Sequence, residues 1–435
     1  MQAKTQRIDV GDLRVGMFIQ LDLGWMAHPF PLSSFRIQAP GQIEEIRALG
    51  VTHVQWVPER SDPAVRAASA ATTTPASRAP EPTETPEQAE ARARRELLQR
   101  QRHIARVCER QYHEASKAWR AAFERVGAEP VRARQEAEGL SRALLSKMLG
   151  DGETCIRVLN SASGDRSTAH AINVAVMSLL LGRAVGLDDT QMMDVGVGAL
   201  MHDVGKLNIS EHLRHIDDHF TPSEVMAYRD HVRHGVEHAR RMGLSAGAAA
   251  VVQQHHEHAD GTGFPGGLRH EAMSEPARIV ALVNRFDTLC NPALLARAMT
   301  PHEALSHLFS QARSRHDATL LAAFIRMMGV YPAGSVVQLT DDRYAIVVSV
   351  NASRPLKPQV LVYDPVVPED QAAQLDLSEC SSIGIRRSLR PTQLPTPAKA
   401  YLAPRPRVAY FFETTVFGTT PSVFDVLAPA QGAVA

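Results

Sequence analysis

The hydrophobic pattern in the middle of the chain is that of amphipathic and buried helices. From residue 132 to 329, apolar residues recur at spacings of three and four, as in Ile172, Val176 and Leu179. This spacing places them on one helix face, and glycines such as Gly186 and Gly243 mark helix ends. Because no stretch here shows a convincing strand pattern, we predict a mainly α protein built on a helical bundle.

A different pattern begins at residue 330. The stretches Ser335–Leu339, Tyr344–Val350 and Val360–Tyr363 are rich in β-branched residues, and Asp341–Arg343 is typical of a hairpin turn. We therefore predict a small, barrel-like β-rich subdomain over residues 330–420, with a loose tail beyond it.

The first 60 residues predict a small α+β domain. Short strands are expected at Ile8–Val10, Met17–Leu21 and Val51–Trp56. One helix is expected over Gln42–Leu49, because Gly50 follows it as a C-terminal cap.

Two connecting segments separate this domain from the helical one. Residues 61–88 are rich in Ala, Thr, Pro, Ser and Glu and poor in large apolar side chains, so they predict a disordered linker. Residues 89–131 are charged and favour helix, which predicts a helical connector. We expect its 89–126 part to be a long exposed helix, either solvated alone or paired with a second copy in a homodimer.

Composition narrows the possible partners. The 435 residues carry a formal net charge of zero, which argues against binding of nucleic-acid polymers or anionic membranes. The four cysteines form no CxxC pair and the start lacks the apolar core of a signal peptide, so we expect a cytoplasmic protein. Apolar runs such as Ala171–Leu181 are too short to predict a membrane segment.

The pair His202-Asp203 lies in an apolar run and offers an imidazole beside a carboxylate. Further residues with nitrogen or oxygen ligand atoms occur before and after this pair along the chain. The candidate metal ligands are His170, His202, Asp203, His231, His255, His256 and Asn284. A set without thiolates suits iron, manganese or another hydrolytic metal.

Individual members of this set allow more than one interpretation. His170 alone also fits a hydrogen-bonded core histidine, and the His255–Gly267 stretch also fits a histidine-rich surface turn. Adjacent helical residues diverge by roughly 100°, so His255 and His256 are expected to serve different metals, or one of them a supporting role.

Asp203 has two oxygens and can bridge two cations, and Lys206 lies one turn after His202, where its ammonium can hold a phosphate oxygen or stabilise a leaving group. Two divalent cations would provide a nucleophile at neutral pH and neutralise a phosphoryl group. The residues therefore predict a metal-dependent phosphohydrolase, with Asp203 and Lys206 as catalytic residues.

At these positions the chain resembles the HD-GYP family of the HD superfamily. The resemblance covers about residues 150–330 and rests on His170, His202–Lys206, His231 and the stretch His255–Pro265. It implies a cytoplasmic bacterial phosphodiesterase that opens cyclic di-GMP with two or three metals, often iron. By the same resemblance, the five candidate histidines and Asp203 bind metal, Lys206 contacts phosphate, and Gly263 and Phe264 help to bind substrate. Residues 1–60 resemble an uncharacterised domain that often precedes HD-GYP domains.

The chain departs from the family pattern at four places. Phe264 replaces the tyrosine of the GYP signature, and Asn284 replaces an aspartate ligand, which should lower metal affinity. An Arg-Pro-Tyr stretch that helps to hold the nucleotide is absent at Asn291, where Arg285 or Arg297 could substitute. Arg166 stands where family members with three metals carry glutamate, which favours a site for two metals here. We expect these metals to be iron or manganese.

We therefore expect hydrolysis of cyclic di-GMP to linear pGpG, GMP or both, in bacterial signalling with diguanylate-cyclase (GGDEF) or other signalling proteins as partners. The alternative is a catalytically weak or inactive domain that acts as a cyclic di-GMP sensor or protein-interaction module. A third possibility is a different phosphate ester as substrate.

Overall fold

The computed structural model describes residues 5–21, 23, 28, 30, 33–63, 65, 85–148, 153–159, 165–215 and 219–415. Most of the predicted linker, residues 66–84, and the predicted loose tail beyond 420 lie outside the described residues. The chain divides into two compact units, Met1–Ala89 and Glu90–Ala435.

The first unit is the predicted α+β domain. Its four-stranded antiparallel sheet has the order β1-β4-β2-β3. The strands are β1 (Gln6–Asp9), β2 (Phe18–Gln20), β3 (Ser34–Arg36) and β4 (His53–Trp56). Helix α1 (Pro40–Ala48) packs Ile43 and Ile46 into the same core as Trp56, and Gly50 has the positive φ of 71° expected at a helix end. Strand β3 had not been predicted.

The second unit opens with the predicted long helix, α3 (Pro86–Arg125), of 40 residues. The expectation that this helix is exposed is wrong for its second half. Residues on one face from Val107 to Ala122, including Tyr112 and Trp119, are buried, and the Trp119 indole donates to the Leu200 carbonyl oxygen at 2.7 Å. This half of α3 is part of the core because its aromatic side chains recur at helical spacing.

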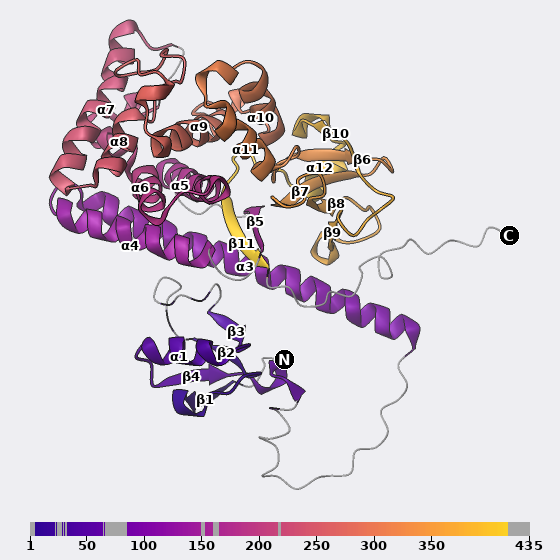
Figure 1. The fold of residues 1–435 in the computed structure, drawn as a ribbon. Helices are drawn as coiled ribbons and strands as arrows, with labels where there is room; N and C mark the ends of the chain where they lie inside the picture. The colour runs from indigo at the N-terminus through magenta and orange to yellow at the C-terminus, as the bar shows by residue number, and fades with distance from the viewer. Residues whose placement is uncertain are drawn as a thin grey trace. The chain divides into compact units, whose positions relative to one another are not determined.

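The helical bundle follows the prediction closely (Figure 1). Its helices are α4 (Pro130–Met148), α5 (Arg166–Val185), α6 (Asp189–Met201), α7 (Pro222–Met242), α8 (Ala246–Gln254), α9 (Glu275–Cys290), α10 (Pro301–Ser310) and α11 (Ala318–Met328). Side chains of Asp165, Asp188 and Thr221 cap the starts of α5, α6 and α7, while Gly186 and Gly243 end α5 and α7 in the left-handed conformation.

Helix α5 is the central helix of this bundle. It is long and apolar enough to cross a membrane by length and composition, unlike the shorter run on which the sequence prediction relied. However, 72% of its apolar window is buried within the protein, as in a core helix of a soluble fold.

One strand contradicts the prediction that residues 132–329 are helical throughout. Strand β5 (Glu153–Val158) precedes α5 and pairs with β7 (Tyr344–Asn351) and β11 (Tyr410–Thr415) in a seven-stranded antiparallel sheet. The other strands are β6 (Val336–Leu339), β8 (Gln359–Val362), β9 (Gln374–Asp376) and β10 (Ile385–Leu389). Strand β5 was not predicted because both of its pairing partners lie far downstream in the sequence.

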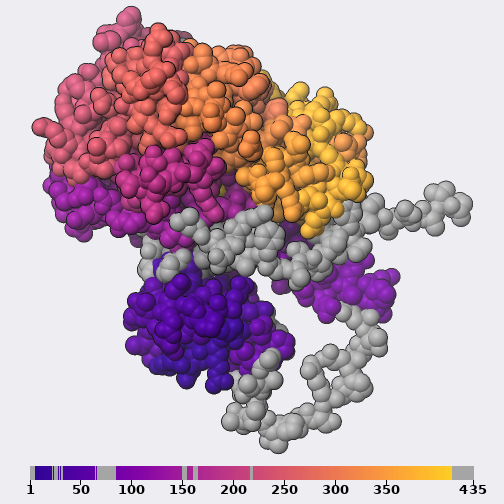
Figure 2. Space-filling view, in the orientation of Figure 1, coloured from indigo at the N-terminus to yellow at the C-terminus, as the bar shows by residue number. Residues whose placement is uncertain are grey.

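The β-rich part is therefore joined to the helical bundle through shared strands. Figure 2 shows its yellow and orange atoms continuous with those of the bundle. Residues of β11 pack on α5, and Phe286 of α9 lies 6.2 Å from the ring of Tyr410. This packing brings the C-terminal segment to one end of the functional site.

Candidate metal centre

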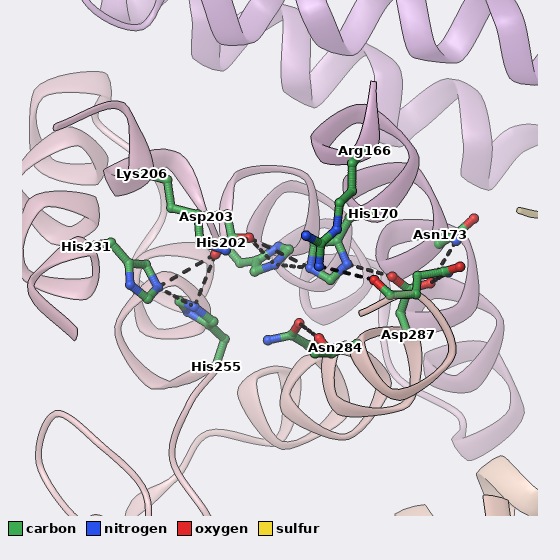
Figure 3. Close-up of polar contacts among 12 residues, drawn as sticks. Arg166, His170, Asn173, His202, Asp203, Lys206, His231, His255, Asn284 and Asp287 are labelled. Carbon is green, nitrogen blue, oxygen red and sulfur yellow. Dashed lines mark hydrogen bonds and ion pairs between the residues drawn. The ribbon is translucent and has the colours of Figure 1, made fainter. Parts of the chain in front are cut away.

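Six of the predicted ligands converge in space around one carboxylate. Figure 3 labels all of them except His256. His170, His202 and Asp203 form one group, called here the first ligand group. Asp203, His231, His255 and His256 form the second ligand group. In each group the candidate ligand atoms lie within 4.8 Å of one another, and Asp203 belongs to both.

Four helices deliver these side chains. His170 lies in the second turn of α5, and His231 lies in the middle of α7. Helix α6 ends at Met201, so His202 and Asp203 occupy the turn between it and the short 3-10 helix Val204–Asn208. Helix α8 ends at Gln254, which places the two adjacent histidines at its C-terminal end.

The imidazole Nε2 atoms point inward. Those of His170 and His202 are 3.2 Å apart, and those of His231 and His255 are 3.3 Å apart. Asp203 Oδ2 lies 3.4 Å from Nε2 of His202, and Asp203 Oδ1 lies 3.6 Å from Nε2 of His231. Each carboxylate oxygen therefore faces a different ligand group.

The opposite ring nitrogens account for this orientation. Nδ1 of His202, His231 and His255 bonds to the carbonyl oxygen three residues upstream, at 2.8, 2.6 and 2.8 Å. A carbonyl only accepts, so each Nδ1 carries the proton and each Nε2 presents a lone pair. This is the tautomer that a metal ligand needs.

Burial supports the same protonation state. Burial lowers the pKa of His231 to about 4, and burial with the nearby His202 and His231 lowers that of His255 well below its ordinary value. Both rings are therefore neutral at pH 7 and available to a cation.

Asp203 completes the evidence that this site fits divalent metal. Burial opposes its charge, but Lys206 and His202 hold the pKa of its carboxyl well below the ordinary range. Oδ2 accepts from the Lys206 ammonium at 2.7 Å, whereas buried Oδ1 has no hydrogen-bond partner among the described residues. A buried anionic oxygen without a partner is costly, and a cation at the second ligand group would satisfy it.

His255 and His256 were expected to serve different metals, or one of them a supporting role, and which of these holds stays a prediction. Both belong to the second ligand group, with ring centroids 4.2 Å apart. The helix stops before them, so the divergence of consecutive helical residues does not apply. Phe264 stacks on His256 at 4.5 Å and 19°, and the Tyr228 hydroxyl lies 3.3 Å from its Nε2.

Asn284 lies on α9, lines the same cavity and is 5% exposed. Its side-chain oxygen is 3.5 Å from the Thr288 hydroxyl, and Figure 3 shows the amide directed toward the imidazoles. Asp287 points elsewhere: its oxygens contact His170 Nδ1 at 2.6 Å and Asn173 Nδ2 at 2.7 Å. Asp287 therefore orients His170 and does not replace the missing carboxylate of Asn284.

Two glycines of the motifs are required by close backbone contacts. A Cβ on Gly205 would lie 1.8 Å from the carbonyl oxygen of His231, and one on Gly263 would lie 2.4 Å from Cα of Glu257. Gly205 thus lets the His202–Lys206 turn approach α7. Gly263 is not among the residues that line the cavity, so its role in the structure is to pack the loop that carries Phe264.

The ligand groups open into a cavity of about 700 Å³, a size typical of ligand sites. Lys206, Phe264 and Arg285 line it, as predicted for substrate-binding residues. Burial opposes the charge of Lys206, but Asp203 raises its pKa, so its ammonium stays charged. Burial and the nearby Arg315 lower the pKa of Arg285.

Sequence reasoning missed two supporting residues. Tyr228 holds Nδ1 of His231 through its carbonyl and approaches His256 with its hydroxyl. Its position three residues before His231 could have indicated it. Asn173 had no such signal, because its partners Asp287 and Tyr410 are distant in sequence.

Comparison with known proteins agrees with this geometry. An HD-domain family matches residues 153–320, and DUF3391, a domain of unknown function, matches residues 5–137. A cyclic di-GMP phosphodiesterase of Pseudomonas aeruginosa is 27% identical over 368 residues, covering 82% of this chain and 85% of that protein. The cyclic di-GMP phosphodiesterase PdeB of Borreliella burgdorferi is 21% identical over 228 residues, covering 52% of this chain and 60% of that protein.

Among solved structures, an HDG"Y"P protein of Bdellovibrio bacteriovorus aligns with a TM-score of 0.39 and 17% identity, over 74% of this chain and 98% of that one. The HD match lies within the region, about residues 150–330, that resembles the HD-GYP family, whereas the DUF3391 match continues past residue 60 to residue 137. The chain therefore contains an HD domain and, ahead of it, a DUF3391 domain.

Proposed function

We propose that this protein is a metal-dependent phosphodiesterase that hydrolyses cyclic di-GMP. The observation that carries the proposal is the position of Asp203, whose two oxygens face two groups of imidazoles. Relatives named as cyclic di-GMP phosphodiesterases share this region, one of them over 82% of the chain.

The donor set fits two divalent cations. Asp203 would be shared, with His170 and His202 on one side and His231, His255 and His256 on the other. Imidazole and carboxylate without thiolate suit iron or manganese. Bound there, such cations polarise a phosphodiester and activate water at neutral pH.

The chain's own residues do the rest. The Lys206 ammonium lies beside Asp203 and faces the cavity, where it can hold a phosphoryl oxygen or stabilise the leaving oxygen. Phe264 offers an aromatic face beside His256, suited to stacking on a base.

The finer parts of the proposal concern product and setting. We propose pGpG, GMP or both as products, and GGDEF or other signalling proteins as partners. The four cysteines are all free and buried, which supports a cytoplasmic setting. The less buried first half of α3 is the proposed homodimer surface.

The test is turnover by protein loaded anaerobically with iron, manganese or cobalt, with metal content measured on the same sample. Linear dinucleotide or GMP should appear with wild type and not with Asp203→Ala. Absence of either product with all three metals would reject the proposal.

A sensor without catalysis is the second candidate, and Asn284 favours it because a neutral amide weakens a cation site. Calorimetric binding of cyclic di-GMP without product formation would support the sensor. Product formation at many turnovers per protein would exclude it.

A further inference from the structure

Two arginines from opposite ends of the second unit line the metal cavity. Arg166 is the first residue of α5, and Arg407 lies in the segment before β11. Both side chains are partly buried. The sequence analysis considered Arg166 only as the residue that stands where three-metal family members carry glutamate, and Arg407 belongs to none of the motifs.

The two guanidinium groups are held close to each other. Arg166 Nη2 donates to the carbonyl oxygen of Asn291 at 3.2 Å, and Arg407 Nη1 donates to that of Pro292 at 3.3 Å. These carbonyls are consecutive in the chain. Burial and the charge of Arg407 both lower the pKa of Arg166, as expected for neighbouring cations.

Neither arginine forms an ion pair with a carboxylate in the part of the chain that the structure describes. The four acidic residues that line the same cavity have other hydrogen-bond partners, although the charges of Asp287 and Asp203 also act on Arg166. Asp165 caps α5 through Thr168, and Glu257 accepts from the backbone amides of Gly266 and Leu268. Two adjacent guanidiniums without a carboxylate in a partly buried cavity favour an anionic ligand.

The segment that carries Arg407 is fixed by the network that orients the first ligand group. Asn291 exchanges two hydrogen bonds with the backbone of Val408, both at 2.9 Å. Asn173 accepts from the Tyr410 amide at 2.8 Å. Both asparagines also donate to Asp287, which contacts His170. Arg407 is therefore held in register with the metal ligands.

We propose that Arg166 and Arg407 form an anion-binding subsite that holds the second phosphodiester of a cyclic dinucleotide, the one not positioned at the metals. Arginine suits this role because its planar fork can donate two hydrogen bonds to one phosphate. This inference rests on the proposed function, because it takes the same ligand as its starting point. It makes the C-terminal segment part of the active site.

The test measures binding and catalysis of full-length Arg166→Gln and Arg407→Gln. Glutamine removes the charge and keeps a donor for the carbonyl of residue 291 or 292. The matched control is Arg405→Gln, since Arg405 is exposed, precedes Arg407 by two residues and does not line the cavity. Arg285→Gln tests the other predicted arginine.

Calorimetry gives the Kd for cyclic di-GMP, with and without manganese, and assays give kcat and KM. Bis(p-nitrophenyl) phosphate, which has a single phosphodiester, serves as the second substrate. Each of the two variants should raise Kd and KM for cyclic di-GMP by about tenfold or more, because charge-assisted hydrogen bonds are lost. In both variants, metal content, kcat and the rate of hydrolysis of bis(p-nitrophenyl) phosphate should stay near the wild-type values. For the control Arg405→Gln, every measured value should stay near wild type.

Unchanged Kd and KM in both variants would overturn the subsite. Weaker binding of cyclic di-GMP only in Arg285→Gln would place the second phosphate at Arg285 instead. Arginine-dependent binding without turnover by wild type would support the subsite and reject the phosphodiesterase. Turnover by wild type together with unchanged Kd and KM in both arginine variants would support the phosphodiesterase and reject the subsite. Wild type that neither binds nor hydrolyses cyclic di-GMP would overturn both.

Discussion

The two ligand groups hold their histidines by different means. In the second group, Nδ1 of His231 and His255 bonds to carbonyl oxygens of the same helix, three residues upstream. In the first group, Nδ1 of His170 meets the carboxylate of Asp287, 117 residues away, which is itself held by Asn173 and Asn291. The second group is therefore organised locally, whereas one ligand of the first depends on contacts with α9 and the C-terminal segment.

The locally held and the distantly held histidines also differ in burial. The side chains of His231 and His255 are fully buried, while that of His170 is 18% exposed. A buried, locally organised group should keep its geometry when distant contacts are disturbed. The first group should respond to changes in the β-rich part of the unit.

The largest effect should come from Asp203→Ala, because Asp203 is the only ligand that both groups share among the described residues. Both metal equivalents and detectable turnover should be lost. Metal analysis and the product assay measure this, with circular dichroism to establish folding. Retention of one full equivalent would show that one group does not need the carboxylate.

His231→Ala should affect the second group alone. About one metal equivalent should be lost, because His170, His202 and Asp203 remain in place. Metal titration by calorimetry counts the remaining sites. Loss of both equivalents would mean that the groups fill only together.

Asp287→Asn should weaken the first group without removing a ligand. The amide binds His170 less strongly than the carboxylate, so metal affinity there should fall by about 10–100-fold. Competition with a chelator measures the affinity. Asp188→Asn is the matched control, since it makes the same change at an exposed helix cap where both side chains are accepted. Equal affinities for Asp287→Asn and wild type would show that His170 needs no distant support.

Asn284→Asp should raise metal occupancy and turnover by a smaller factor. It adds a charge next to the cavity without changing the shape of the side chain. Metal content after identical loading and the initial rate measure the effect. If neither changes, Asn284 does not bind metal.

The pH dependence of the metal-free protein should reflect the burial of the second group. The pKa of His231 is about 4 when folded, below its ordinary value of 6.5, so the unfolded chain binds more protons between these pH values. The free energy of unfolding should therefore fall as pH drops from 6.5 to 4, by up to roughly 3 kcal/mol from this residue. Urea unfolding at several pH values measures it, and His231→Gln should show a shallower slope. Equal slopes for wild type and His231→Gln would contradict the lowered pKa of His231 in the folded protein.

Local features were predictable because their causes lie within a few residues. Apolar spacing and helix-ending glycines predicted α5 through α8, and the hairpin at Asp341–Arg343 predicted β6 and β7. Strand β5 was missed because its partners, β7 and β11, lie almost 200 residues or more downstream. The burial of half of α3 was missed for the same reason.

By itself, the sequence determined which residues can bind metal and predicted the helices next to them, because residue chemistry and helical period are local properties. It also placed Asp203 and Lys206 within one turn of His202. The tertiary structure alone decided that His255 and His256 share a group, that Asp287 supports His170, and that Arg407 reaches the cavity. These outcomes depend on where helices end and on which distant segments pack together, and those are settled by the burial of the whole core.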